Sequence, residues 1–373
     1  EVYRRTADEV AAAGVRQPFL KGEVMNQTSF GKDNKGVEYT LYSFTNKNNM
    51  TMVLSDLGAT LVKLLVPAKD GSVKDVVLGY DTPQEYIDNT CYFGTVIGRS
   101  GNRIANGRFM INGKTYQLGI NDNDNNLHSG PDGYDNRKWD VKAVDEEKNS
   151  ITFSLHSPDG DQGFPGNATL CVTYTLSEDN EIILHYEADT DADTVMNPTN
   201  HTYFNLAGHD SGKILDQTLW LAAKGFTVVH DHQAIPTGEI ALVAGTPMDF
   251  TTAKPIGRDI EADFQQMKYV GGYDHNYALR EAPGERMKMA EAHSDKTGIT
   301  LEAFTTCCGV QLYAGNFITP QKGKDGASYS ERDGFCLEAQ FYPNAINQEN
   351  FASPILKAGE HYSSTTSYRF SVQ

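Results

Sequence analysis

The sequence has no apolar run of about 18 residues, the length that a membrane-spanning helix needs. It also has no surplus of positive charge, since 32 lysines and arginines stand against 49 aspartates and glutamates, for a formal net charge of -17. Proteins that bind nucleic acids or anionic membranes need cationic surface to neutralise phosphate groups. We therefore expect neither nucleic acid nor a membrane among the partners of this protein.

Cysteine is scarce and follows no pattern. The five cysteines include no Cys-x-x-Cys pair, and an odd number at scattered spacing forms no disulfide framework. We expect small, mostly buried thiols in a reducing compartment, which favours a cytoplasmic location. A periplasmic or secreted location stays open, because a leader removed before Glu1 would leave no trace in this sequence.

Helical periodicity is nearly absent, and strand-like segments replace it from Phe19 onward. Short runs of β-branched and aromatic residues alternate with turns rich in Gly, Asn and Asp. The clearest runs cover residues 39–44, 50–54, 59–66, 150–156, 168–176 and 181–187. This pattern predicts an all-β sandwich or barrel. A short helix is expected after Thr82, with Thr82 as its cap and Pro83 at its first position.

The chain also lacks internal repeats, low-complexity tracts and linkers between residues 19 and 373. We therefore expect one domain over residues 19–373, preceded by an N-terminal extension over residues 1–18 with a short helical patch. Residues 322–328 are expected to form a mobile loop within that domain.

The stretch 197–208, Asn-Pro-Thr-Asn-His-Thr-Tyr-Phe-Asn-Leu-Ala-Gly, surrounds His201 with amides, hydroxyls and aromatic rings. Such side chains can hold a hydroxyl-rich ligand, and a histidine among them can serve as a general acid or base near neutral pH. The alternative is a half-buried strand whose histidine is hydrogen-bonded for structure alone.

A second titratable group, Glu338, lies in the apolar run 335–340 with no cation beside it. Strand alternation puts Cys336, Glu338 and Gln340 on one face, but it does not decide whether that face meets solvent or the interior. If Glu338 is buried, its pKa is raised and it becomes a usable acid or base.

Several polar loops have both a ligand-binding and a structural interpretation. The glycine-rich segment 98–107 offers Arg99 and Arg103 as donors, but it lacks the Gly-Lys-[Ser/Thr] ending of a phosphate loop. Asp274, between glycines and aromatics in segment 271–277, can grip a sugar or close a turn.

Two stretches resemble metal-binding motifs but lack residues that such motifs require. The Asn/Asp-rich stretch 121–130 is not an EF-hand, because Leu127 stands where the glycine belongs and Gly133 where the glutamate belongs. His230 and His232 have the spacing of a pair of ligands, but no third ligand is evident, and a pair of exposed histidines is the simpler interpretation.

Taken together, these stretches resemble the aldose 1-epimerase (galactose mutarotase) family, in the family's order and over essentially residues 19–373. The resemblance is carried by segments 98–107, 126–130, 159–166, 200–206, 272–275, 311–316, 337–340 and 363–370. The sequence departs from the family at Ala339, where a proline is usual, and at the vicinal Cys307 and Cys308.

The resemblance implies a large antiparallel β-sandwich of the galactose mutarotase-like supersandwich type with few short helices. It implies an isomerase that interconverts the α and β anomers of free hexoses, D-galactose and D-glucose above all, without a cofactor or metal. The expected partner is a free aldohexose, and the expected assembly is a monomer or homodimer. By motif, the catalytic residues are the acid His201 and the base Glu338, and the substrate-binding residues are Asn102, Arg103, His128, Tyr203, Asp274 and Gln311.

The sequence is also compatible with two other functions. A non-catalytic carbohydrate-binding protein could keep the cleft, although it would have no need of both His201 and Glu338. A glycosidase would need a second carboxylate near Glu338, for which Asp274 is the candidate.

Overall fold

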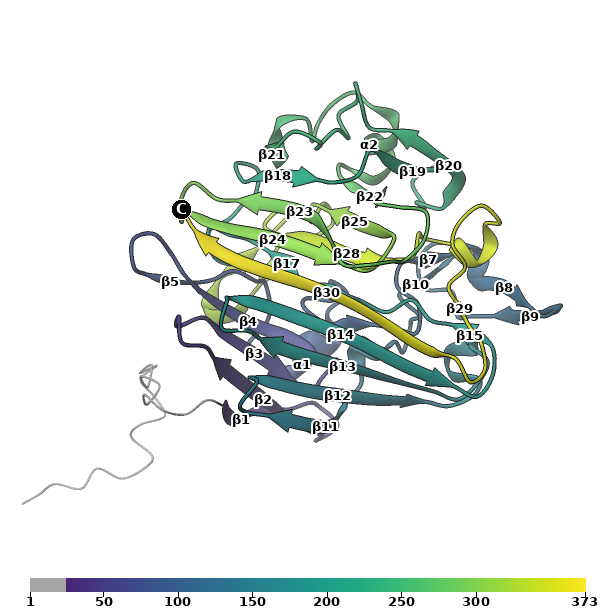
Figure 1. The fold of residues 1–373 in the computed structure, drawn as a ribbon, viewed down its shortest axis with the longest axis horizontal. Coiled ribbons are helices and arrows are strands. Elements are labelled where there is room, and N and C mark those ends of the chain that lie inside the picture. Colours follow the sequence, from purple (N-terminus) through teal and green to yellow (C-terminus); the bar gives the residue numbers. More distant parts are fainter. Residues whose placement is uncertain (1–24) are drawn as a thin grey trace, which may run out of the picture.

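The computed structural model describes residues 25–373, so the extension predicted over residues 1–18 lies outside the described residues. Strands dominate the described chain, and every ladder between its named strands is antiparallel (Figure 1). Two α-helices are present there, α1 (Pro83–Asp88) and α2 (Gln265–Val270). The predicted all-β class with few short helices is confirmed.

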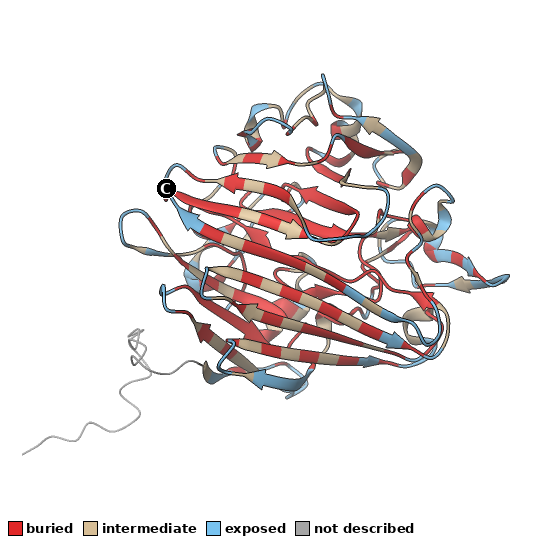
Figure 2. Cartoon of the chain, in the orientation of Figure 1, coloured by how far each residue is buried: buried red, intermediate tan, exposed pale blue. Residues whose placement is uncertain are grey.

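The largest sheet has nine strands and runs across the front of the molecule in Figure 1. In spatial order its strands are β11 (Asp140–Asp145), β12 (Ser150–Ser157), β13 (Ala168–Leu176), β14 (Glu181–Thr190), β30 (His361–Val372), β24 (Ile299–Thr305), β23 (Met287–His293), β18 (Thr218–Leu221) and β21 (Lys254–Pro255). Buried and partly exposed residues alternate along β12 and β14, as the bands of Figure 2 show. One face of this sheet therefore covers the core and the other meets solvent.

Two further sheets contribute side chains to the same core. The five-stranded sheet contains, in order, β1 (Met25–Lys32), β2 (Glu38–Thr45), β3 (Thr51–Ser55), β4 (Thr60–Pro67) and β5 (Val73–Asp75). The six-stranded sheet contains β17 (Tyr203–Phe204), β28 (Phe335–Gln340), β25 (Gly309–Tyr313), β22 (Asp274–Ala278), β19 (Gly225–Val229) and β20 (Pro236–Leu242). Phe44, Val172 and Leu337, one from each sheet, belong to one buried hydrophobic cluster. The three sheets therefore share one continuous core among the described residues.

Short pairs and turns complete the chain. The two-stranded ladders are β10 (Asn126–Leu127) with β7 (Arg103–Ile104), β15 (Thr194–Val195) with β29 (Ile355–Leu356), β16 (Thr199–Asn200) with β6 (Val96–Ile97), β26 (Gln321–Lys322) with β27 (Ser328–Tyr329), and β8 (Arg108–Ile111) with β9 (Lys114–Gln117). The 3₁₀ turns are η2 (Ala105–Gly107), η3 (Tyr134–Asn136), η4 (Asp161–Gly163), η5 (Ile256–Arg258), η6 (Lys324–Gly326) and η7 (Ala345–Asn347).

Local signals in the sequence explain helix α1. Thr82 caps it, Pro83 occupies its first turn, and the side chain of Glu85 bonds back to the cap in a capping box. The cap satisfies amide groups that a helix N-terminus otherwise leaves without partners. The predicted helix start is confirmed.

The loop around η6 is held more firmly than expected. Lys324 is fully buried, donates a hydrogen bond of 2.6 Å to the backbone oxygen of Val62, and pairs with Asp75 at 2.7 Å. A buried ammonium group needs such partners to offset its lost hydration. The mobile loop predicted for residues 322–328 is therefore wrong, because a side chain that usually faces solvent here ties the loop to the five-stranded sheet.

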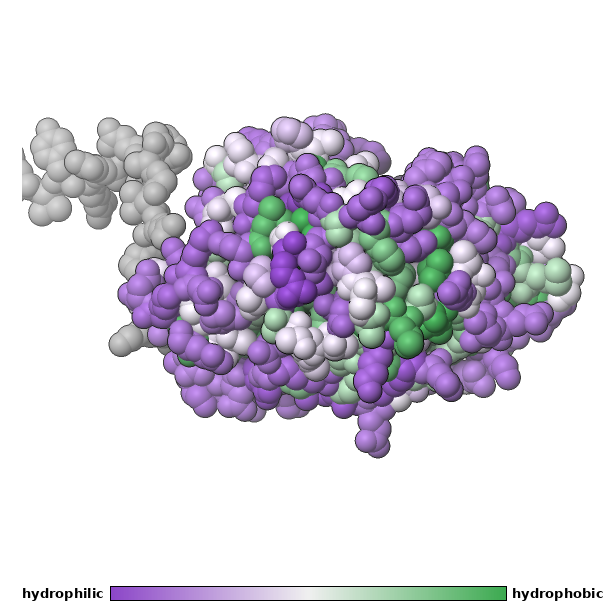
Figure 3. Space-filling view, turned by 90° about the horizontal axis from the view of Figure 1, so that it is seen from above, coloured by the Kyte–Doolittle hydropathy of each residue, from purple (hydrophilic) through white to green (hydrophobic). Residues whose placement is uncertain are grey.

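The face of the molecule that is seen from above in Figure 3 is mainly hydrophilic. Figure 3 shows one face of the molecule, where polar residues predominate and apolar residues gather in small groups. No helix among residues 25–373 is long and apolar enough to cross a membrane.

Candidate active site

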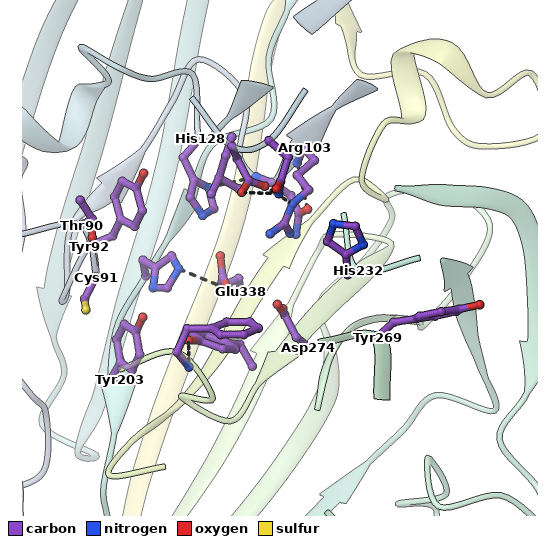
Figure 4. A pocket seen from close by; sticks show the side chains of 17 residues that line it. Thr90, Cys91, Tyr92, Arg103, His128, Tyr203, His232, Tyr269, Asp274 and Glu338 are labelled. Atoms are coloured by element: carbon purple, nitrogen blue, oxygen red, sulfur yellow. Dashed lines mark hydrogen bonds and ion pairs between the residues drawn. The ribbon is translucent and has the colours of Figure 1, made fainter. Parts of the chain in front are cut away.

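A cavity of about 450 Å³ opens above the six-stranded sheet. Its walls combine strand residues with residues from distant loops (Figure 4). In that view Glu338 lies in the middle, Tyr92 and Tyr203 on one side, and His232 and Tyr269 on the other. Seven of the eight predicted site residues line it: His201, Glu338, Asn102, Arg103, His128, Tyr203 and Asp274.

The register of the six-stranded sheet brings its functional side chains together. Strand β28 lies between β17 and β25, where Cys336 pairs with Tyr203 and Glu338 pairs with Gln311. Leu337 points into the core, whereas Glu338, on the other face, lines the cavity. Glu338 is only 2% exposed. The alternation predicted for β28 is confirmed, and the interpretation of Glu338 as a solvent-face residue is wrong.

His201 and Glu338 face each other directly. Nε2 of His201 lies 3.7 Å from Oε1 of Glu338, and Oε2 of Glu338 has no hydrogen-bond partner in the described part of the chain. The backbone of His201 is fixed on both sides, because its amide donates to Thr95 and its oxygen accepts from Gly94. An unpartnered buried carboxylate oxygen is costly unless a ligand or water satisfies it.

Burial shifts both groups of this pair toward their uncharged forms. It lowers the pKa of His201 to about 4. Burial, together with the negative charge of Asp274, raises the pKa of Glu338 well above its ordinary value, and Arg103 opposes that rise. The pKa of His201 therefore lies below the neutral range expected for a general acid or base, because loss of hydration disfavours the charged ring. Both shifts favour the uncharged form of the pair, in which the proton is on Glu338.

Aromatic rings and a thiol hold the His201 ring. It stacks on Tyr203 with ring centroids 5.1 Å apart, and its Nδ1 lies 3.6 Å from Sγ of Cys336. These contacts leave Nε2 as the nitrogen that faces Glu338. The other polar residues of the stretch have structural roles: the side chain of Asn200 donates to Gly94 and accepts from Thr202. The ligand-binding interpretation of the stretch therefore fits His201 and Tyr203 alone, the two that line the cavity.

His128 is bound to Asn102 through backbone and ring. Its amide donates to the Asn102 oxygen at 3.0 Å, and its Nδ1 accepts from the Asn102 amide at 3.1 Å. Both residues have positive φ, 53° and 55°, a conformation that few residues other than glycine adopt. Because Nδ1 is an acceptor, the neutral ring carries its hydrogen on Nε2, where it can serve as a donor.

His128, His201 and Glu338 lie close enough to one another to raise the question of a metal ion. A histidine ligand must present a free lone pair. Nδ1 of His128 already uses its lone pair for the Asn102 amide, and Nε2 then carries the hydrogen. The hydrogen bonding of His128 therefore does not fit a three-residue metal site, and the exposed His230 and His232 belong to no such group among the described residues.

The polar floor continues through Asp274 and Gln311. Nε2 of Gln311 donates to Oδ1 of Asp274 at 2.7 Å, and Gln340 donates to Oε1 of Gln311 at 3.2 Å. Burial raises the pKa of Asp274, and the charge of Arg103 and the bond from Gln311 oppose the rise. Gln311 is not among the residues that line the cavity, so it reaches the site through Asp274.

The glycine-rich segment divides between two roles. Arg99 is 1% exposed and donates to backbone oxygens of Pro165 and Gly166, which makes it a structural residue. Arg103, four residues later, lies largely buried in the cavity wall and pairs with Asp122. The sequence left open whether this segment binds a ligand or is an ordinary loop, and the structure places only Asn102 and Arg103 at the cavity.

Sequence reasoning missed much of the outer wall. The additional lining residues are Thr90, Cys91, Tyr92, Asp122, Asn123, Leu127, His232, Tyr269, Tyr313 and Phe317. They come from separate loops and strand ends, and most have no motif of their own. The aromatic residue Tyr313, two positions after the predicted Gln311, was the available signal.

The chain matches the sequence profile of the aldose 1-epimerase family over residues 40–369. It is 42% identical to galactose mutarotase from Bos taurus over 316 residues, which is 84% of this chain and 89% of the relative. It is 40% identical to aldose 1-epimerase from Escherichia coli (strain K12) over 341 residues, 90% of this chain and 96% of the relative.

Solved structures of epimerases also superpose on this chain. An aldose epimerase homologue from C. elegans superposes with a TM-score of 0.82 at 32% identity, covering 89% of this chain and 98% of that one. Galactose 1-epimerase from Lactobacillus acidophilus NCFM superposes with a TM-score of 0.80 at 28% identity, covering 93% and 98%. The supersandwich architecture that the resemblance implied is confirmed by these neighbours. On the profile match and the relatives together, this chain belongs to the aldose 1-epimerase family.

Proposed function

We propose that this enzyme interconverts the α and β anomers of free aldohexoses in the cavity, with His201 and Glu338 as its two proton-transfer groups. The observation that carries the proposal is their contact: an imidazole and a carboxylate, both buried, 3.7 Å apart in a cavity large enough for a sugar. Membership of the aldose 1-epimerase family supports the isomerase activity.

Anomer exchange needs two coordinated proton transfers. Glu338, as the carboxylate, takes the proton of the C1 hydroxyl while the ring C1–O bond breaks. His201, as the imidazolium, gives a proton to the departing ring oxygen, so the open-chain aldehyde forms. Rotation about C1–C2 presents the other face of the aldehyde, and closure by the reverse transfers gives the other anomer. Each positioned proton transfer typically accelerates such a step ~10²–10⁴-fold.

The two protonation states of the pair then serve the two halves of the reaction. Ring opening converts ionised Glu338 and protonated His201 into protonated Glu338 and neutral His201, and closure restores the ionic state. Burial favours the uncharged state. Arg103 lowers the pKa of Glu338, so the cation in the wall favours the ionic state from which opening starts.

The remaining predicted residues would hold the sugar. His128 offers Nε2–H as a donor, Asp274 offers acceptor oxygens, and Arg103 offers its guanidinium. Tyr203 supports the His201 ring by stacking, and Gln311 orients Asp274. We propose D-galactose and D-glucose as substrates, since related proteins carry the names galactose mutarotase and, more broadly, aldose 1-epimerase.

The wider assignments remain proposals as well. The five cysteines of residues 25–373 are free thiols, four of them buried, which supports a reducing compartment such as the cytoplasm. We propose that residues 19–373 form one domain. We also propose that the protein is a monomer or a homodimer, two states that size-exclusion chromatography with light scattering would distinguish.

Polarimetry tests the function directly. Freshly dissolved α-D-galactose and α-D-glucose should lose their initial rotation much faster with the wild-type enzyme than in buffer alone. His201→Asn and Glu338→Gln should bring the rate close to that of buffer while both variants still bind sugar. A wild-type protein that binds sugar without accelerating mutarotation would be a non-catalytic binder, and release of nitrophenol from a nitrophenyl galactoside would indicate a glycosidase.

A further inference from the structure

The Asn/Asp-rich turn at residues 121–125 has a specific partner in the cavity wall. Oδ2 of Asp122 accepts a hydrogen bond of 2.7 Å from Nε of Arg103, and both side chains are largely buried, with 21% and 13% exposed. Both residues line the cavity. A short charged bond at partial burial is stronger and better ordered than an exposed surface ion pair.

The backbone brings this turn to Arg103. Strand β10 follows the turn directly and pairs with β7, so that Leu127 lies opposite Arg103. The amide of Asp122 donates to the Asn125 oxygen, and the amide of Asn125 donates back to Asp122. Nδ2 of Asn123 donates to Oδ1 of Asp122 at 3.2 Å, which orients the second carboxylate oxygen. Contacts within the turn therefore hold the carboxylate of Asp122 in position, independently of its bond to Arg103.

Only the Nε edge of the Arg103 guanidinium is used by this bond. Nη1 and Nη2 make no hydrogen bond to residues 25–373, so their hydrogens remain available to a ligand in the cavity. Arginine has a long side chain that loses much rotamer freedom when it is held in one place. A carboxylate at Nε removes that freedom in advance, which improves ligand binding by preorganisation.

The charge of Arg103 also acts on two other carboxylates. Asp274 and Glu338 line the same cavity, and the charge of Arg103 lowers the pKa of each. Without Asp122, the guanidinium would be free to turn toward these two groups. Such a pair would occupy the arginine and an acceptor that the sugar needs.

We propose that Asp122 is a positioning residue that holds the Arg103 guanidinium with its terminal nitrogens toward the sugar. The inference deepens the proposed function, on which it rests, by assigning a role in sugar binding to the turn at residues 121–125. Asp122 acts on sugar affinity through Arg103 and takes no part in the proton transfers of His201 and Glu338.

Steady-state kinetics on four proteins tests this role. Asp122→Ala should raise KM for D-galactose about five- to tenfold and leave kcat within about twofold, because loss of orientation weakens binding without removing a proton-transfer group. Asp122→Asn, which keeps an acceptor oxygen but no charge, should give a smaller rise. Asp124→Ala is the matched control, since Asp124 is an exposed aspartate of the same turn that makes no side-chain hydrogen bond within residues 25–373. Its KM should equal that of the wild type.

A double-mutant cycle separates action through Arg103 from direct contact. In an Arg103→Ala background, Asp122→Ala should cause no further rise in KM, because nothing remains to be positioned. Independent rises that multiply in the double variant would overturn the proposal, as would an unchanged KM in Asp122→Ala. Calorimetric titration with D-galactose repeats the comparison without catalysis. If the wild type binds sugar but does not accelerate mutarotation, the proposed reaction fails while the binding cycle still decides the role of Asp122.

Discussion

Nε2 of His201 lies 3.7 Å from Oε1 of Glu338, and burial pushes the two groups in opposite directions along the pH scale. Groups this close titrate as a pair. The pair can catalyse mutarotation only while it holds one proton, because two protons leave no base and none leaves no acid. The pH dependence of the reaction therefore reports the fate of that single proton.

The free enzyme should show a bell-shaped profile of kcat/KM against pH with limbs assigned by the structure. The acidic limb should follow protonation of His201, whose pKa is lowered to about 4, and the alkaline limb should follow ionisation of Glu338, whose pKa is raised. This order reverses the one expected from ordinary pKa values. Nitrogen-15 NMR of labelled histidine should find a neutral His201 ring at neutral pH, and a charged ring in the free protein would contradict the assignment.

Glu338→Gln should lower kcat at least ~100-fold and leave sugar binding nearly intact. The amide preserves shape and polarity, but it cannot accept the C1 hydroxyl proton. Polarimetry gives kcat and calorimetry gives the binding constant. A variant that keeps more than about a tenth of wild-type kcat would show that another group is the base.

The same substitution should make the protein more stable, increasingly so at higher pH. A raised pKa in the folded state means that Glu338 contributes stability below its unfolded pKa, and this contribution is lost as pH rises through the folded pKa. Glutamine has no proton to lose. The free energy of unfolding of Glu338→Gln should therefore exceed that of the wild type by an amount that grows between about pH 5 and about pH 8. Urea denaturation of both proteins at these two values measures the difference. A difference that shrinks with pH would argue against a buried, protonated Glu338.

Arg103→Ala should act mainly on binding. Loss of a hydrogen bond from a charged donor costs about 1.5–3 kcal/mol, so KM for galactose should rise roughly tenfold or more. Because Arg103 also lowers the pKa of Glu338, the alkaline limb of the pH profile should move to higher pH in the variant. Unchanged KM together with an unmoved limb would assign Arg103 to the loop structure alone.

Gln311→Leu should reduce affinity through Asp274. The substitution removes the 2.7 Å hydrogen bond that lowers the pKa of Asp274, so that carboxyl should be protonated over a wider pH range. KM should rise several-fold, and the rise should be largest at the acidic end of the profile, where Asp274 takes up its proton. A thermal melt checks that the fold survives, and an equal rise at every pH would show that the effect is steric.

Local sequence patterns were enough to predict the features that depend on interactions between residues close together in the chain. Thr82 and Pro83 predict the start of α1, and alternation along residues 335–340 predicts which side chains share a face. The family motifs brought His201 and Glu338 forward together, and the structure places them in contact. The pKa of His201 was not predictable, because it depends on how many chain segments cover the ring.

Features that depend on distant partners escaped the sequence. Arg99 and Arg103 stand in one glycine-rich segment with the same chemistry, and only the fold decides that the first lies inside the protein and the second in the cavity wall. Lys324 looks like an ordinary loop lysine until Asp75 and Val62 are brought to it from far along the chain. Residues that pair over such long distances in the sequence leave no local motif from which the contact could be predicted.

The floor of the cavity is built from strands of a sheet, whereas its rim is built from the connections between strands. Glu338 and Asp274 stand on β28 and β22, which both pair with β25 in the six-stranded sheet, whereas His232 and Phe317 stand on connections outside the strands. Exchange of the rim segments for those of a relative would leave the reacting groups in register. Such chimaeras could therefore acquire a new sugar preference while keeping the same chemical step, which makes the rim the natural starting point for engineering this enzyme.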